Sequence, residues 1–133
     1  ATKNKDSELG ATDLVLALEG HINAKAYSFK RLVDEPIIND TFEEIPILIA
    51  LSNDHSTAKI YDRRVDGQTL NFKQSWLGQK LIDSETGTEW SVLTGTGQSG
   101  KHAGKTLTPI PAPYVLWFAW KGYRPDTVIH GES

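Results

Sequence analysis

Residues 45–66 constrain the fold of this chain more than any other stretch of its sequence. Residues 45–51 are almost continuously apolar and have the length of a strand, which is typical of a strand buried on both faces. After the polar residues 52–56, residues 58–65 alternate between apolar and polar, and Asp66-Gly67 then supplies a strong turn signal. The segment therefore predicts a core hairpin that is followed at once by a second one.

Similar signals recur along the rest of the chain. Residues 13–19 and 26–29 predict a first hairpin, residues 70–76 continue the hairpin at Asp66-Gly67, and residues 81–94 predict a further hairpin around a Ser-Glu-Thr-Gly turn. Residues 106–110 predict one more short strand. Turn signals at about every 8 to 12 residues favour an all-β fold, a single-domain antiparallel barrel or sandwich with one or two short helices.

Two segments carry helix signals. Pro36 restricts residues 30–42 to a short helix or turn, because proline disfavours helical geometry in the residue before it. Residues 114–123 are rich in aromatic side chains and predict a helix that starts after Pro113 and ends near Gly122, although a buried strand fits as well.

The ends and the composition set outer bounds. Residues 1–12 are polar and aperiodic and predict a flexible N-terminal arm, which leaves 13–133 as a single β-rich domain.

With 14 basic and 17 acidic residues the net charge is −3, which argues against nucleic acid as a partner. No apolar run approaches the roughly 18 residues of a transmembrane segment. The chain has no cysteine, which excludes disulfides, thiolate metal sites and cysteine nucleophiles.

The turn at residues 52–56 holds the main candidate site. His55 could ligate a transition metal or transfer a proton, since the ordinary pKa of histidine suits both tasks. Asp54, with Ser52 and Asn53, could supply oxygen ligands or fix the histidine tautomer. The alternative is a solvated turn, because serine, asparagine and aspartate stabilise turns. A metal site would also need a distant second ligand, and His21, His102 and His130 each lie in predicted solvated loops or in the tail.

Three further patterns have weaker functional readings. Residues 95–102 fit a Gly-rich nucleotide motif, but no helix signal follows Lys101, so a flexible hairpin loop is the better interpretation. The aromatic residues 114–123 could stack on a ligand, yet their spacing more simply anchors a helix on the sheet. Carboxylates near hairpin ends could form an acid/base pair of a hydrolase, but they are more typical of turns and rims; these are Asp62, Asp66, Asp83, Glu85 and Glu89.

Asp62 and Arg63 are neighbours on one predicted strand. If Tyr61 points inward, successive side chains point to opposite faces, so an ion pair between Asp62 and Arg63 is not expected. Each should find its own cross-strand partner.

Several segments together resemble one bacterial family. These are YDRRVDGQTLNF, DSETGTEWSVLTG, HAGKTLTPIP and WFAWKGYRPDT, with INAKAYSFKRL and PIINDTF in the same style. They resemble the family known as domain of unknown function 3179, over residues 14–130. Members are often exported or lie beside membrane and redox proteins, so the resemblance implies an extracytoplasmic setting, periplasmic or secreted. It implies no particular activity.

One departure from the family pattern falls on the candidate turn. Many relatives carry Cys-Pro-x-Cys-Gly-Thr before the Asp-Arg strand, whereas this chain has Ser52-Asn53-Asp54-His55-Ser56-Thr57. Ser52 and His55 stand at the two cysteine positions, so a thiol-based role is excluded here. The sequence thus predicts a non-catalytic extracytoplasmic binding or interaction module with a protein partner or subunit, for example within a larger redox assembly. The alternative is a metal-binding domain or metalloenzyme that uses His55 and Asp54.

Overall fold

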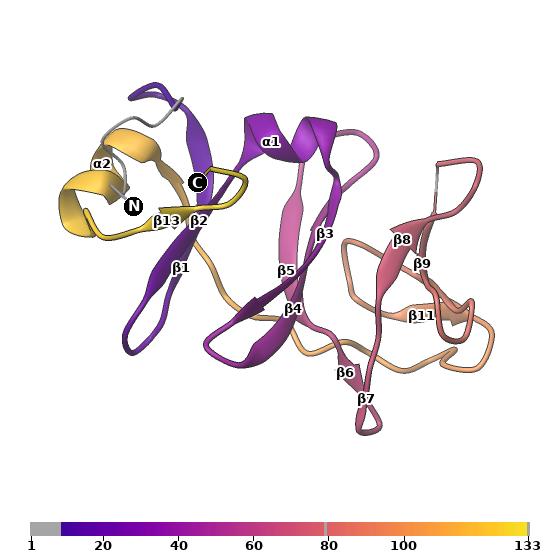
Figure 1. Cartoon of the computed structure of the whole chain (residues 1–133). Coiled ribbons are helices and arrows are strands. Elements are labelled where there is room, and N and C mark those ends of the chain that lie inside the picture. Colours follow the sequence, from indigo (N-terminus) through magenta and orange to yellow (C-terminus); the bar gives the residue numbers. More distant parts are fainter. Residues whose placement is uncertain (1–8, 79, 133) are drawn as a thin grey trace. The chain divides into compact units, whose positions relative to one another are not determined.

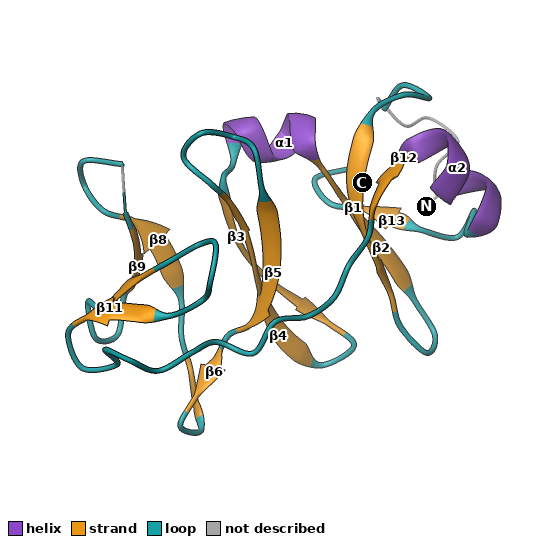
Figure 2. Ribbon diagram, turned by 180° about the vertical axis from the view of Figure 1, so that it is seen from behind, coloured by secondary structure: helices purple, strands orange, loops and turns teal. Residues whose placement is uncertain are grey.

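The computed structural model of the chain describes residues 9–78 and 80–132. The fold is mostly β-structure, as predicted, with two short helices in the described part (Figure 2). The chain forms two compact units, which we describe separately: a terminal unit, from the residues up to Asp34 and from Pro111 onward, and a central unit, Glu35–Ile110. Most of the predicted N-terminal arm lies outside the described residues. Its last part is a turn in which the Asp13 amide donates to the Gly10 carbonyl over 3.1 Å.

The terminal unit is one four-stranded sheet with two helices (Figure 1). Its elements are β1 (Leu14–Glu19), β2 (Ala24–Ser28), α1 (Phe29–Asp34), β12 (Tyr114–Leu116), α2 (Trp117–Tyr123) and β13 (Val128–Ile129). The strand order is β12-β1-β2-β13. β1 and β2 form the predicted hairpin, while β13 pairs with β2 in parallel, an exception to the antiparallel prediction.

Both predicted helices are present but short. The hydroxyl of Ser28 accepts the amide of Arg31 at the start of α1, a helix N-cap, and α1 ends before Pro36 as predicted. Of residues 114–123, only Trp117–Tyr123 form the predicted helix α2; Tyr114–Leu116 form the strand β12, which is largely exposed and so is not the buried strand of the alternative prediction. Trp117 and Trp120 are buried and anchor α2, whereas Tyr114 lies on β12 and is half exposed. Neither helix in the described chain has the length and apolar content needed to span a membrane.

The central unit contains three sheets. Its strands are β3 (Ile37–Phe42), β4 (Ile45–Leu51), β5 (Ala58–Asp62), β6 (Arg64–Val65), β7 (Gln68–Thr69), β8 (Phe72–Gln74), β9 (Leu81–Asp83), β10 (Glu89–Trp90) and β11 (Gly97–Ser99). The sheet orders are β3-β4-β5, β6-β7 and β11-β10-β9-β8. The core hairpin β4–β5 and the hairpin at Asp66-Gly67 are confirmed.

An apolar core joins the two larger sheets of the central unit. Its members come from both sheets, from β6 and from the connections: Leu48, Ala50, Tyr61, Val65, Leu70, Phe72, Leu81, Trp90 and Leu107. None of the sheets formed by the described residues closes into a barrel. Of the two predicted architectures, the sandwich-like one is therefore the one observed.

Three local predictions were wrong. The polar half of residues 37–42 suggests a turn, but these residues form β3, because β4 offers a complete antiparallel partner. The glycine-rich loop contains β11 and is not simply a flexible hairpin loop. Residues 106–110 make only isolated bridges, at Thr106 and Pro109, in place of the predicted strand.

Candidate functional site

The turn between β4 and β5 is held by its own side chains. One carboxylate oxygen of Asp54, Oδ1, accepts hydrogen bonds from the Ser52 hydroxyl (2.7 Å), the Ser56 hydroxyl (2.7 Å) and the Ser56 amide (3.0 Å). The backbone closes beneath them, with the Ser52 amide donating to the Thr57 carbonyl over 2.8 Å. The Ser52 hydroxyl, and then Ser56, lower the pKa of Asp54 to about 2. Asp54 is therefore a fixed anion.

His55 lies at the tip of this turn. Its side chain is exposed, and its backbone adopts the left-handed conformation, with φ of 61°. Among the described residues, no three histidine, aspartate or glutamate side chains are grouped so that they could hold a metal ion. No such group therefore includes His55 within the part of the chain that the structure describes, and a metal site at His55 and Asp54 stays a prediction.

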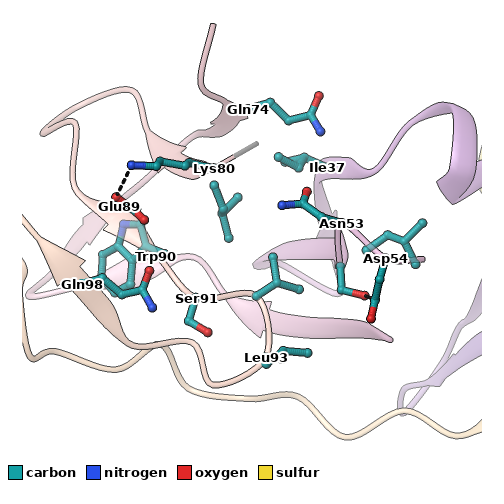
Figure 3. Close-up of a pocket in the computed structure, with 14 residues that line it drawn as sticks. Ile37, Asn53, Asp54, Gln74, Lys80, Glu89, Trp90, Ser91, Leu93 and Gln98 are labelled. Atoms are coloured by element: carbon teal, nitrogen blue, oxygen red, sulfur yellow. Dashed lines mark hydrogen bonds and ion pairs between the residues drawn. The ribbon is translucent and has the colours of Figure 1, made fainter. Parts of the chain in front are cut away.

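Three residues of the turn line a pocket of about 370 Å³ in the central unit. In Figure 3, Asn53 and Asp54 lie on one side of this pocket with Ile37, while Lys80, Glu89, Trp90 and Gln98 lie on the other. Apolar side chains complete the lining, namely Ile37, Leu51, Leu81, Val92 and Leu93. The lining thus combines apolar side chains with a larger number of polar ones, and the volume falls in the usual range of ligand pockets.

The sequence pointed to one side of this pocket and missed the other. Ser52, Asn53 and Asp54 were predicted as a candidate site, and all three line the pocket. The opposite side comes from residues 74–98, whose functional role the sequence did not indicate. The exceptions are Glu89, one of the candidate carboxylates, and Gln98, which lies in the glycine-rich motif considered for nucleotide binding.

The candidate carboxylates each have a separate partner. An acid/base pair needs one carboxyl that stays protonated near neutral pH. Glu89 lines the pocket, but Lys80 pairs with it at 3.3 Å (Figure 3), and the pKa of Asp54 is lowered rather than raised. The other candidates have separate partners: Asp62 with Arg64, Asp66 with Lys105, Asp83 with Trp90, and Glu85 with Asn71.

Asp83 corrects the prediction that these carboxylates lie at the rim. It is completely buried and accepts the Trp90 indole N–H over 2.9 Å, and also the Thr86 amide and hydroxyl. Burial alone would raise the pKa of Asp83, but the hydrogen bonds from Trp90 and Thr86 outweigh it and lower the pKa. Asp83 thus positions Trp90, which lines the pocket.

His102 also corrects a prediction, since it is buried and not solvated. It is 2% exposed, and its ring lies 5.9 Å from the Trp90 ring, centroid to centroid. Neither ring nitrogen has a hydrogen-bond partner in the described part of the chain. The loop folds tightly here, because a Cβ on Gly97 would lie 2.2 Å from the His102 carbonyl oxygen. This backbone lacks the helix that a phosphate-binding loop requires.

Arg63 and Asp62 take separate partners, as predicted, but only Arg63 does so across strands. The buried guanidinium of Arg63 donates to the carbonyls of Ile47 (2.8 Å), Leu70 (2.9 Å) and Asp40 (2.9 Å). Burial lowers the pKa of Arg63, although an arginine keeps its charge. Asp62 instead pairs with Arg64 two residues along, so the expected cross-strand partner of Asp62 was wrong. Tyr61 is buried as expected.

Comparison with known proteins gives one result. A family model described as protein of unknown function (DUF3179) matches residues 1–130. The chain belongs to this family. No curated protein and no solved structure matches the chain.

The DUF3179 family is described as one of unknown function, so membership assigns no chemical role to the turn. The turn must be interpreted from its contacts, and these join it to the pocket through Ser52, Asn53 and Asp54. In this DUF3179 chain the turn is a rigid, anionic side of a pocket whose other side is set by Trp90.

Proposed function

We propose that this chain is a non-catalytic binding module that holds part of a partner protein in the pocket of its central unit. The observation that carries the proposal is the make-up of this pocket, with apolar walls from Ile37, Leu93 and Trp90 and an anionic rim at Asp54. Such a surface suits an apolar side chain with a polar or basic neighbour.

The rigidity of the lining supports binding in preference to catalysis. Trp90 is fixed by Asp83, and Asp54 is fixed by Ser52 and Ser56. Fixed groups lose little conformational freedom when a ligand binds, which favours affinity. Asp54 is a weak base because its pKa is about 2, and Lys80 pairs with Glu89.

Exposed apolar residues that follow a pocket-lining residue in the chain also support a protein partner. Trp76 is 93% exposed and Leu77 is 65% exposed, and both follow Gln74, which lines the pocket. Tryptophan is enriched among the residues that dominate protein interfaces. The extracytoplasmic setting and the redox assembly remain proposals that rest on the resemblance to the family.

Selection from a random linear peptide library on the immobilised protein tests this function. Selected peptides, resynthesised, should bind the wild type, and Leu93→Asp should weaken that binding at least about tenfold by placing a charge in the apolar wall. Ile22→Asp is the matched control, because Ile22 is an exposed apolar residue of the terminal unit, and it should bind as the wild type does. Failure to select any binding peptide, or equal binding to Leu93→Asp, would overturn the proposal.

A further inference from the structure

The edge strands β3 and β8 are joined at one place by a side chain instead of a backbone ladder. The Asn39 side-chain amide donates to the Phe72 carbonyl and accepts the Phe72 amide, both over 2.8 Å. Asn39 therefore occupies the place that a peptide group of an intervening strand would take. The edge of β8 already accepts a strand-like partner at Phe72.

The next outward-facing residue of β8 is Gln74. In β8 the hydrogen bonds to β9 alternate: the Ser84 amide donates to Asn71 and the Ser75 amide to Lys80, so residues 71, 73 and 75 face β9. Phe72 and Gln74 must then direct their backbone N–H and C=O away from β9. None of the hydrogen bonds in the described chain engages the backbone of Gln74.

The same alternation applies to Ile37 on β3. The Leu51 amide donates to the Pro36 carbonyl, so Pro36 and Ile38 face β4, while Ile37 and Asn39 direct their backbone groups to the opposite side. The contacts of the described residues leave the backbone N–H and C=O of Ile37 without a partner. Ile37 and Gln74 both line the pocket (Figure 3).

From this arrangement we infer that the pocket receives an extended peptide segment of the partner, added as a strand between the ends of β3 and β8. One residue of the segment pairs with Gln74 and the adjacent residue pairs with Ile37, because successive residues of a strand present their backbone groups to opposite sides. The inference rests on the proposed function and specifies how the partner binds.

The lining of the pocket defines the side chains of this segment. A side chain that points inward meets the apolar wall formed by Leu93, Val92 and Trp90. Charge also matters, because Glu89 is paired with the cation Lys80, whereas Asp54 accepts hydrogen bonds from the neutral groups of Ser52 and Ser56 and remains an anion at the edge of the pocket. The segment is therefore an extended peptide with an apolar residue and a nearby lysine or arginine.

A matched pair of variants at Gln74 tests strand addition on the protein. Gln74→Pro removes the outward-facing N–H and leaves the ladder to β9 intact, whereas Gln74→Ala removes only the side chain. We expect Gln74→Pro to weaken binding of a selected peptide at least about tenfold and Gln74→Ala to change it less than about threefold. Circular dichroism and thermal unfolding of both variants establish that Gln74→Pro remains folded.

Ester substitution tests strand addition on the peptide. Replacing one backbone amide at a time by an ester removes an N–H without adding bulk, and two adjacent positions should lose binding. A peptide that binds the wild type and fails on Leu93→Asp, yet tolerates an ester at every position, would overturn strand addition and leave the proposed function standing. If no peptide binds at all, the proposed function itself fails.

The variant Asp54→Asn tests the preference for a lysine or arginine in the peptide. Asp54→Asn keeps the oxygen that accepts from Ser52 and Ser56, so the turn should persist. Peptides with a lysine or arginine should lose affinity for Asp54→Asn, while versions with glutamine in its place should bind both proteins equally. Equal binding of the basic peptide to both proteins would contradict the assigned charge preference.

Discussion

The two units each bury a tryptophan whose indole N–H donates to a side chain seven residues away in the chain. In the terminal unit Trp120 donates to the Thr127 hydroxyl over 2.8 Å, and in the central unit Trp90 donates to the Asp83 carboxylate over 2.9 Å. The first acceptor is neutral, and the second is charged. A buried charge needs several hydrogen bonds to offset its lost hydration, which Thr86 and Trp90 supply for Asp83.

This difference extends to the whole of each unit. The buried polar residues described for the terminal unit are Ser28 and Thr127, neither of which ionises. In the central unit they include Arg63, Asp83 and His102. Most of its strands have two or three residues and supply few ladder hydrogen bonds, so side chains such as Arg63 and Asn39 bind backbone groups instead. The unit that contains the pocket is therefore the one that depends on buried charge.

Arg63 gives the largest expected effect. Arg63→Met should lower the free energy of unfolding of the central unit by about 3–5 kcal/mol, because the carbonyls of Ile47, Leu70 and Asp40 would lose their donor. Hydrogen exchange read by mass spectrometry can follow residues 35–110 separately from the terminal unit. Arg64→Met is the control, since the pair of the exposed Arg64 with Asp62 is screened by solvent and should contribute little to stability. Equal effects of the two variants would contradict the structural role of Arg63.

Asp83 gives the next effect, and this one depends on pH. Asp83→Asn should cost about 2–3 kcal/mol at pH 7, because an amide cannot accept from both Thr86 and Trp90 as a carboxylate does. The pKa of Asp83 is lower in the folded protein, so its charged form stabilises the fold at pH above the unfolded pKa of about 3.9. That stabilisation is lost as the pH falls through the lower, folded pKa.

Urea unfolding of the wild type and Asp83→Asn at a series of pH values measures this dependence. The difference in free energy of unfolding should be constant above about pH 5 and should narrow below about pH 4. A difference that widened on acidification would mean that the folded state raises the pKa of Asp83.

Thr127→Val tests the tryptophan contact whose acceptor is neutral. Thr127→Val keeps the shape of the side chain but leaves the Trp120 indole N–H without its acceptor, which should cost about 1–2 kcal/mol. No titrating group takes part in this contact, so the cost should not vary between about pH 3 and pH 7. If the loss of unfolding free energy caused by Thr127→Val changed with pH as the loss caused by Asp83→Asn does, the neutral and the charged tryptophan contacts would not differ in the way proposed.

The successes of the sequence analysis are local ones. The hairpins at residues 45–62 and at Asp66-Gly67 are predictable because alternation and turn chemistry act between residues close in the chain. The same turn chemistry predicts the turn at Ser52, Asn53 and Asp54, but not that these residues line a pocket.

The remaining features depend on contacts between distant segments. Asp83 and Thr86 form a turn, as their sequence suggests, but no local pattern indicates that Asp83 is buried and accepts the Trp90 indole N–H. The second side of the pocket arises where β3 and β4 meet the sheet of β8 to β11, and no local pattern specifies that meeting. β3 was missed because Asn39 and Asp40 favour turns, and pairing with β4 overrides that preference.

His102 gives the smallest expected effect and tests whether every buried polar group of the central unit is needed. A glycine-rich sequence predicts a solvated histidine, yet the ring is buried beside Trp90 with no hydrogen bond to either nitrogen from the described residues. Unlike Arg63 and Asp83, His102 has no such bond to lose. His102→Leu should therefore change the free energy of unfolding at pH 7.5 by less than about 1 kcal/mol, whereas His102→Ala should cost about 2–4 kcal/mol through the cavity it leaves. Urea unfolding of both variants measures this. A loss for His102→Leu as large as that for His102→Ala would show that the ring nitrogens, and not the volume of the ring, stabilise the unit.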